Sequence, residues 1–289
     1  MSNTFVAHSH IQFKDKNGLV CAFLYENYSI SPHYHEFYEM NIVFSGKGTH
    51  KINQSKINVK SGDVFVIPPF TTHTYYDTDN LDVYHILLHK DFILQNKTQS
   101  DKVPGFLQLT EIEPYLRQNN DHSVFLHLNA EQLLQIKKEL IFIEDNGIFD
   151  TKEYIPIKYH TTWKILYWLS YLLNEQNHSD VKTSYGKYNQ TIINSLEYIH
   201  KNYGEKITIK TLCENAYLSR STFLRYFNEI CNENPIRYLN NYRCKRAIEI
   251  MDNTNCSKTE TALLCGFYDL SHMEKSLNKY LKNQKQKPD

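Results

Sequence analysis

The sequence predicts a multidomain α+β protein, in which an N-terminal antiparallel β region is followed by helices and then by an all-α C-terminal region. Residues 5–95 read as short strands separated by Gly, Pro, Asn and Asp turns. Beyond Asn120 the apolar residues recur at helical spacing almost to the lysine-rich end of the chain. With 289 residues, 41% of them hydrophobic and 22% charged, the chain can form two domains with separate cores and is too apolar to be disordered.

Residues 1–120 have the pattern of a β-sandwich or barrel. Their β-branched or alternating runs include NIVFSGKGTHKI and GDVFVIPP. Turn residues interrupt these runs at regular spacing, at 46–48, 61–63 and 68–69. Many short strands with few helices between them favour a single β domain.

Residues 121–178 predict two helices. Asn129 and Gln132 have the spacing of a capping box that opens a helix running to Gly147. A second helix, over 155–176, is apolar nearly all round and needs two surfaces to bury against. Either it is sunk in one core, or one of its faces meets a second copy of the chain, so we expect this region to mediate homodimerisation.

Residues 179–190 are polar, include Gly186 and lack apolar periodicity, so we expect a linker there. The charge changes sign across it. Residues 1–189 carry 17 Lys and Arg against 21 Asp and Glu, whereas residues 190–289 carry 15 against 11. The basic C-terminal part favours a polyanionic partner.

Targeting signals are not evident. The N-terminus has no basic stretch followed by an apolar run, so no signal peptide is expected. The most apolar helical segment, WKILYWLSYLL, is far shorter than the roughly 20 residues of a membrane span. The six cysteines form no CxxC pair, which is typical of free thiols in a reducing compartment. We therefore expect a cytoplasmic protein without a membrane partner.

Residues 207–230, ITIKTLCENAYLSRSTFLRYFNEI, predict two short helices joined by a tight turn, capped by Thr208 and Ser219. This is the pattern of a helix-turn-helix, which lays its second helix in the DNA major groove. The outward positions of that second helix carry donors suited to phosphates and base edges: Arg220, Ser221, Thr222 and Arg225.

The remaining sequence, 231–289, repeats this plan. NENPIRYLNNYRCKRAIEIM predicts a long helix that Pro235 can open at its first position. SKTETALLCGFYDLSHMEKSLNKYL then predicts a second helix pair, with Gly266 and Phe267 in its turn. Two similar pairs bridged by one helix are much more specific than one pair, so we expect a double helix-turn-helix domain over 191–289.

Residues 191–281 resemble the DNA-binding domain of AraC/XylS-type transcription regulators, through LSRSTFLRYF, NPIRYLNNYRCKRAIEIM and ALLCGFYDLSHMEKSLNKY. In that family two helix-turn-helix units, joined by a rigid helix, insert into successive major grooves. The resemblance implies that Arg243 and Arg246 on the joining helix serve surface pairing or backbone contact. It also implies DNA contacts from Ser221 and Arg225 in the first unit, and from Ser271, His272 and Lys275 in the second.

The second unit departs from the family pattern. Lys258 and Thr261 replace the usual isoleucines, Met273 and Leu277 replace an aromatic pair, and the usual Gly-x-Ser-Pro ending is absent. We expect a weaker apolar core in this unit and less specific DNA reading.

A histidine cluster marks the N-terminal region. In HYHEFYEMNIVFSG, His33 and His35 share one face of a strand because side chains alternate, and Glu39 follows four residues later. This stretch resembles the first motif of the cupins, small antiparallel jelly rolls whose mouth holds a ligand or metal. GDVFVIPPFTTH resembles most of the second motif, with Phe70 where metal cupins usually carry glycine. The resemblance implies a site for zinc, iron or manganese formed by His33, His35, Glu39 and His73.

Three interpretations of this cluster stay open: polar residues that hold each other or an effector, a bound metal, or metal-dependent catalysis. The first is favoured, because AraC-type regulators often keep this pattern without a demonstrated catalytic role. Aromatic rings stack on sugars and bury apolar effectors, although most aromatic residues are simply core. Further candidates for an effector pocket are Tyr25, Phe65, Tyr75 and His85.

The sequence thus predicts a transcription regulator that binds promoter DNA under control of a small-molecule effector, such as a sugar or another metabolite. We expect a homodimer that contacts RNA polymerase if it is an activator, no catalytic residues, and no cofactor unless the cluster holds a divalent transition metal. Two alternatives remain: a metal-dependent cupin enzyme with a helical appendage, and a protein-binding adaptor that has lost DNA contact.

Overall fold

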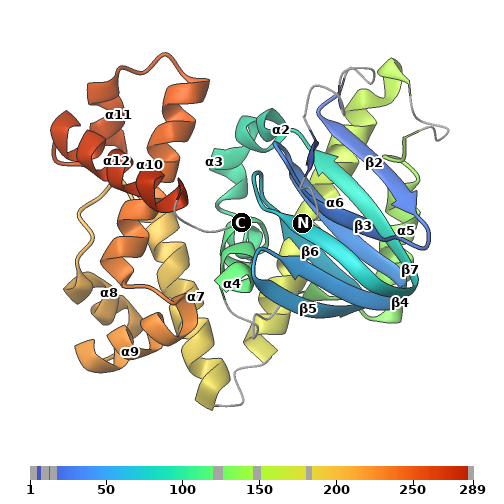
Figure 1. Cartoon of the computed structure of the whole chain (residues 1–289), viewed down its shortest axis with the longest axis horizontal. Coiled ribbons are helices and arrows are strands. Elements are labelled where there is room, and N and C mark those ends of the chain that lie inside the picture. Colours follow the sequence, from blue (N-terminus) through green and yellow to red (C-terminus); the bar gives the residue numbers. More distant parts are fainter. Residues whose placement is uncertain are drawn as a thin grey trace. The chain divides into compact units, whose positions relative to one another are not determined.

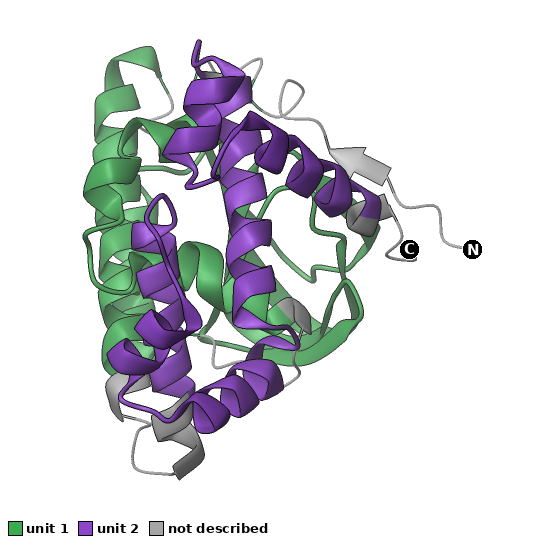
Figure 2. Cartoon of the chain, turned by 90° about the vertical axis from the view of Figure 1, so that its left-hand side faces the viewer, with its two compact units in different colours: residues 1–180 green, residues 181–289 purple. Residues whose placement is uncertain are grey.

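The computed structural model describes residues 5–7, 13, 18–119, 126–145, 151–179 and 184–285. The chain forms two compact units, residues 1–180 and 181–289 (Figure 2). The first unit is a β-sheet with helices, and the second is helical, as the predicted fold class requires (Figure 1).

Within the described residues, the strands of the first unit form one eight-stranded sheet. All pairings are antiparallel except that of β1 with β3. The strands are β1 (Phe5–Ala7), β2 (Val20–Tyr25), β3 (Ile30–His35), β4 (Tyr38–Ile52), β5 (Ser55–Lys60), β6 (Asp63–Ile67), β7 (His73–Leu88) and β8 (Leu126–His127).

Strand β7 organises this sheet. It pairs with β4 along almost its whole length, with β3 near its start and with β2 over its second half. Strand β4 shifts register three times between Val43 and Thr49. Gly46 lies within these shifts at φ +73, and a Cβ atom there would lie 2.1 Å from the carbonyl oxygen of Asn80. Only glycine fits at this close approach of β4 to β7 without backbone movement.

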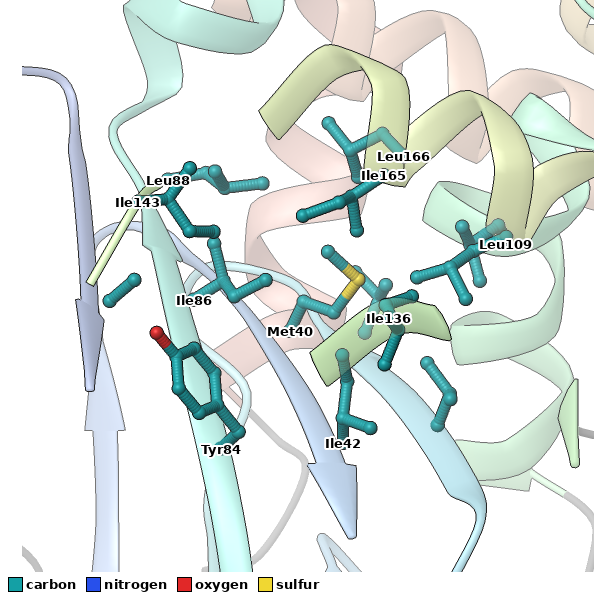
Figure 3. Close-up of a cluster of buried hydrophobic side chains, with 14 of the residues drawn as sticks. Met40, Ile42, Tyr84, Ile86, Leu88, Leu109, Ile136, Ile143, Ile165 and Leu166 are labelled. Carbon is teal, nitrogen blue, oxygen red and sulfur yellow. The ribbon is translucent and has the colours of Figure 1, made fainter. Parts of the chain in front are cut away.

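Helices cover one face of the sheet. Those of this unit are α2 (Lys90–Gln95), α3 (Lys97–Ser100), η1 (Gln108–Ile112), α4 (Glu113–Asn119), α5 (Ala130–Leu140), η2 (Lys152–Tyr154) and α6 (Ile155–Ser179). Figure 3 shows Met40 and Ile86 of the sheet packed with Ile136 of α5 and Ile165 of α6. The apolar residues on the different sides of α6 all contact this same core, so one chain suffices to bury them. They are Trp163, Ile165, Leu166, Leu169, Leu172 and Leu173.

The capping box of α5 is present, since the side chains of Asn129 and Gln132 each accept from the other's backbone N–H. The predicted extension to Gly147 is wrong, because α5 ends at Leu140. Asp145 instead pairs with β2: its backbone N–H donates to the Ala22 carbonyl, and its Oδ2 accepts from the Ala22 N–H. These tertiary hydrogen bonds prevail over local helical periodicity.

The same Asp145 also anchors α6. Its Oδ1 lies 2.5 Å from the Lys158 Nζ, and both residues are buried. A charge buried without its partner is costly, so each member of such a pair depends on the other.

The second unit contains α7 (Ser184–Asn202), α8 (Ile209–Ala216), α9 (Arg220–Cys231), α10 (Pro235–Asn253), α11 (Lys258–Leu264) and α12 (Leu270–Lys285). The predicted caps are present, since Thr208 and Ser219 each accept a backbone hydrogen bond at the start of α8 and α9. Pro235 opens α10 as predicted. The pairs α8–α9 and α11–α12 flank α10 (Figure 1).

Helix α7 begins inside the predicted linker, 179–190, of which residues 180–183 lie outside the described residues. A lone glycine such as Gly186 costs a helix only about 1 kcal/mol and does not end it. Polar composition alone therefore overestimated the length of the linker.

The core of the α11–α12 pair is intact despite the substitutions there. Thr261 is fully buried, and its hydroxyl donates to the Ser257 carbonyl, so its polar atom is satisfied. Lys258 is exposed and does not enter the core. The core itself combines Cys244, Ala247, Ala262, Cys265, Phe267 and Met273.

We predict that Asp145→Ala lowers the free energy of unfolding of the first unit by about 3–5 kcal/mol, because it breaks the buried ion pair with Lys158. Both tryptophans, Trp163 and Trp168, lie on α6, so their fluorescence during urea unfolding reports on this unit.

The matched control is Lys164→Ala, which removes an exposed ion pair between α6 and Glu139 of α5. It should cost less than about 1 kcal/mol. Equal losses from the two substitutions would contradict the role given to Asp145.

Candidate functional site

The predicted cluster lies on the sheet face opposite the helical core. His33 and His35 come from β3, Glu39 from the start of β4 and His73 from the start of β7. All four are less than 5% exposed. The pairing of β3 with β7 sets His33 opposite His73, and their ring centroids lie 4.2 Å apart.

Each of these three histidines has a fixed tautomer. Their Nδ1 atoms lie within hydrogen-bonding distance of main-chain carbonyls, and a carbonyl oxygen can only accept. Each Nδ1 therefore carries a proton, and each neutral ring keeps a lone pair on Nε2. The bonds join His33 to Ser31 at 3.1 Å, His35 to Phe37 at 2.7 Å and His73 to Thr71 at 3.2 Å.

The Nε2 atoms of His35 and His73 face the carboxylate of Glu39. Nε2 of His35 lies 3.3 Å from one carboxylate oxygen, and Nε2 of His73 lies 3.8 Å from the other. Ligand atoms of His33, Glu39 and His73 all lie within 4.8 Å of one another. His35, the fourth predicted ligand, contacts the carboxylate but falls outside that set.

Burial keeps the rings of His33 and His35 neutral. Desolvation lowers the pKa of His33 and His35 from 6.5 to about 4. Burial alone would raise the pKa of Glu39, but its imidazole neighbours, among them His85 through a hydrogen bond, hold this pKa well below its ordinary value. His85 supplies this hydrogen bond through its Nδ1, 3.1 Å from the carboxylate.

The cluster therefore holds more acceptors than donors. Neutral Nε2 atoms and an ionised carboxylate face one another, an arrangement that a cation would stabilise. Three imidazoles and a carboxylate are ligands for zinc, iron or manganese. The main-chain carbonyls behind each Nδ1 are the kind of outer partner that orients metal-bound histidines. The residues present thus fit a divalent transition metal.

Of the further pocket candidates, His85, Phe65 and Tyr75 are buried, and Tyr25 is half-exposed. The Tyr25 ring contacts His85 at 5.2 Å between centroids. Phe65 and Tyr75 contact a residue that the sequence did not single out, His50, at 5.4 and 4.0 Å.

His50 is fully buried, and neither ring nitrogen has a hydrogen-bond partner among the described residues. Asn41 was also missed; its amide donates to the Tyr75 hydroxyl at 3.1 Å. Both belong to β4, and the register shifts between them hide their common face in the sequence. Phe70 adopts φ +61, which explains why glycine is usual at this position.

In the second unit, α9 presents the first set of predicted DNA contacts. Arg220, Ser221 and Arg225 are exposed on this helix, and Thr222 is partly buried. The Ser219 hydroxyl lies 3.1 Å from that of Ser221 and 2.8 Å from that of Thr222. Exposed donors at the start of the second helix of the pair are placed as a recognition helix requires.

Ser271, His272 and Lys275 are exposed in the first turns of α12. His272 is partly engaged, because its Nδ1 accepts from the backbone N–H of Tyr268. Of the two joining-helix arginines, Arg246 forms an ion pair as expected, whereas Arg243 is buried rather than on the surface. Arg243 is buried against main-chain carbonyls, and Arg246 pairs with Glu249.

No helix in the part of the chain that the structure describes is both long and apolar enough to cross a membrane. The sequence pattern of the AraC-like ligand binding domain matches residues 19–136, and that of a helix-turn-helix domain matches residues 212–283. A β unit with a buried polar cluster and a pair of helix-turn-helix motifs thus define a DNA-binding protein with a ligand-binding domain.

The HTH-type transcriptional regulator YdeC of Bacillus subtilis (strain 168) is 25% identical over 256 residues, 85% of this chain and 82% of that protein. The HTH-type transcriptional activator RhaS of Pectobacterium carotovorum subsp. carotovorum (strain PC1) is 25% identical over 249 residues, which are 86% of this chain and 83% of that protein. The DNA-binding domain of AdpA, solved with a target DNA, is 24% identical and covers 32% of this chain and 82% of that one, with a TM-score of 0.31. The chain belongs to the AraC family of transcription regulators.

We predict that the first unit loses stability as the pH falls from 6.5 to 4. In that window the unfolded state binds protons at His33 and His35 that the folded state does not, so acid favours unfolding. The loss is at most about 3 kcal/mol per histidine. Urea unfolding at successive pH values, followed by tryptophan fluorescence, measures it.

His35→Gln should flatten this pH dependence, whereas His160→Gln, at an exposed position of α6, should leave it unchanged. An unchanged slope in the His35 variant would contradict the assignment.

Proposed function

We propose that this regulator is controlled by a small effector bound at the buried cluster of the first unit, and that binding there changes how the second unit is presented to promoter DNA. The observation that carries this proposal is that Nε2 of His35 and Nε2 of His73 face the Glu39 carboxylate. Neither Nε2 atom has a hydrogen-bond partner among the described residues. Such a set favours an added cation or donor, and a ligand can shift a conformational equilibrium only through such differential contacts.

The proposed occupants are a divalent metal ion, or an organic effector that donates to the same atoms. His33, Glu39 and His73 would hold the metal, with His35 beside them. When bound, the ion would supply positive charge that balances the carboxylate and the lone pairs. His85 would keep Glu39 oriented through its Nδ1. No enzymatic step is part of this proposal.

For the second unit we propose that α9 and α12 read promoter DNA in successive major grooves. Exposed Arg220 and Arg225 on α9, and Lys275 on α12, support this. We also propose a homodimer, because two copies would double the number of recognition helices on a promoter. RNA polymerase would be a further partner if the regulator activates.

Arg225→Ala should weaken DNA binding about tenfold and lower the slope of log affinity against log salt by about one, because one phosphate or base contact is lost. Fluorescence anisotropy on a duplex selected in vitro by the full chain, over a series of salt concentrations, measures both quantities.

Arg237→Ala is the matched control, since Arg237 is exposed on α10 and pairs with Glu233. It should change neither quantity. An unchanged affinity in the Arg225 variant would instead favour the protein-binding adaptor.

We predict that the purified full chain, after treatment with chelator, binds one equivalent of Zn²⁺ or Mn²⁺ in calorimetric titration. His73→Ala and His33→Ala should each lower the affinity at least about tenfold, whereas His160→Ala should not. DNA affinity measured with and without the ion tests whether the site controls the second unit.

If neither ion binds, the organic effector is favoured, and mapping of the genomic binding sites would narrow its identity through the target genes. Stoichiometric metal in a chain that binds no DNA would instead favour the metal-dependent enzyme.

A further inference from the structure

Three segments of the second unit meet around Arg243. This residue lies near the middle of α10, which joins the two helix-turn-helix pairs, and it is 8% exposed. The loop 203–205 leads from α7 into the first pair, and the turn 264–266 lies inside the second pair. Arg243 lies between Gly204 of the loop and Gly266 of the turn.

The guanidinium of Arg243 binds main-chain atoms of the loop that leads into the first pair. Its Nε donates to the Tyr203 carbonyl at 2.8 Å, and its Nη2 donates to the Glu205 carbonyl at 2.7 Å. These carbonyls follow the end of α7, where the helix dipole is negative. Both of these guanidinium hydrogen bonds thus go to carbonyl oxygens, and the negative end of the α7 dipole faces the positive charge of Arg243.

The turn inside the second pair contacts the same loop and the same guanidinium. A Cβ atom at Gly266 would lie 2.6 Å from the Tyr203 carbonyl oxygen and 2.7 Å from Nη2 of Arg243. A Cβ atom at Gly204 would lie 2.8 Å from the Leu264 carbonyl oxygen. The backbone of the loop 203–205 is therefore in close contact with that of the turn inside the second pair, and the Tyr203 side chain packs on the core of the second pair.

A lysine cannot replace this arginine at equal geometry. Two carbonyls are held at once by a planar fork with fixed donor directions, whereas an ammonium on a flexible stem fixes neither direction. Other contacts between α7 and α10, such as the stacking of His200 on Tyr242, hold these helices together without fixing the turn at Gly266.

We propose that Arg243 is a positioning residue that fixes the distance and rotation between α9 and α12, and thereby the spacing of the two DNA segments that this regulator accepts. This rests on the proposed function, in which both helices read DNA. Each base pair inserted between the two segments moves one of them by about 3.4 Å and rotates it by about 35° around the duplex axis. A rigid pair of helices rejects such a change, whereas a loosened pair tolerates it.

The test uses the full chain and a duplex selected by that chain from a random library. Probes with one base pair inserted or deleted between the two selected segments give a spacing profile for the parent, Arg243→Lys and Arg243→Met. Arg237→Met, an exposed position on the same helix, is the control. Circular dichroism melting confirms that each variant is folded at the assay temperature, and the lysine variant remains available if the methionine variant is not.

For the parent and the control we expect affinity to fall about tenfold for each change of spacing, in the range of a mismatched base pair. For the Arg243 variants we expect weaker binding to the selected probe. The ratio of affinities between the selected probe and a probe of altered spacing should fall to about twofold. A residue that only stabilised the fold would lower the affinity for every probe equally and leave this ratio unchanged.

A preserved ratio in the folded Arg243 variants would therefore overturn the inference while leaving the proposed function intact. A parent chain that selects a single segment would overturn it as well, because no spacing would then exist to be fixed. A parent that selects no sequence would contradict the proposed function itself.

Discussion

The pairing of β7 with three other strands is the constraint on which the first unit depends. This strand joins β4 along one edge and both β2 and β3 along the other. Its inward residues therefore meet those of every strand that carries a polar cluster residue. His73 at one end faces His33, and His85 near the other end reaches Glu39. A one-residue slip of β7 would turn these histidines to the opposite face.

That geometry creates an electrostatic imbalance in the interior. Backbone carbonyls bind Nδ1 of His33, His35 and His73, and burial keeps the rings of His33 and His35 neutral, so lone pairs and a carboxylate are confined together. Buried polar groups of this kind usually mark a site where the fold has given up stability for function. On the helical face of the same sheet, the described residues form a large apolar cluster.

The fold class, the helix caps and the two helix-turn-helix pairs could be predicted because local signals decide them. Asn129, Thr208, Ser219 and Pro235 act within a few residues of their own position. The cluster of His33, His35, Glu39 and His73 was also predictable, since its motif spacing is fixed along the strands. His50 was not, because the register shifts of β4 reverse which positions face inward. The end of α5 was missed for a similar reason: a distant strand, β2, decides it.

Two buried cysteines of the second unit determine how its core reacts with oxidants. Cys244 and Cys265 lie in the core of the α11–α12 pair, and burial raises their pKa to about 12 and about 11. Thiols with such values remain protonated at neutral pH and react slowly with oxidants, since the thiolate is the reactive form. Oxidation of these two thiols would therefore require the core around them to open first, so their resistance to oxidants is set by packing.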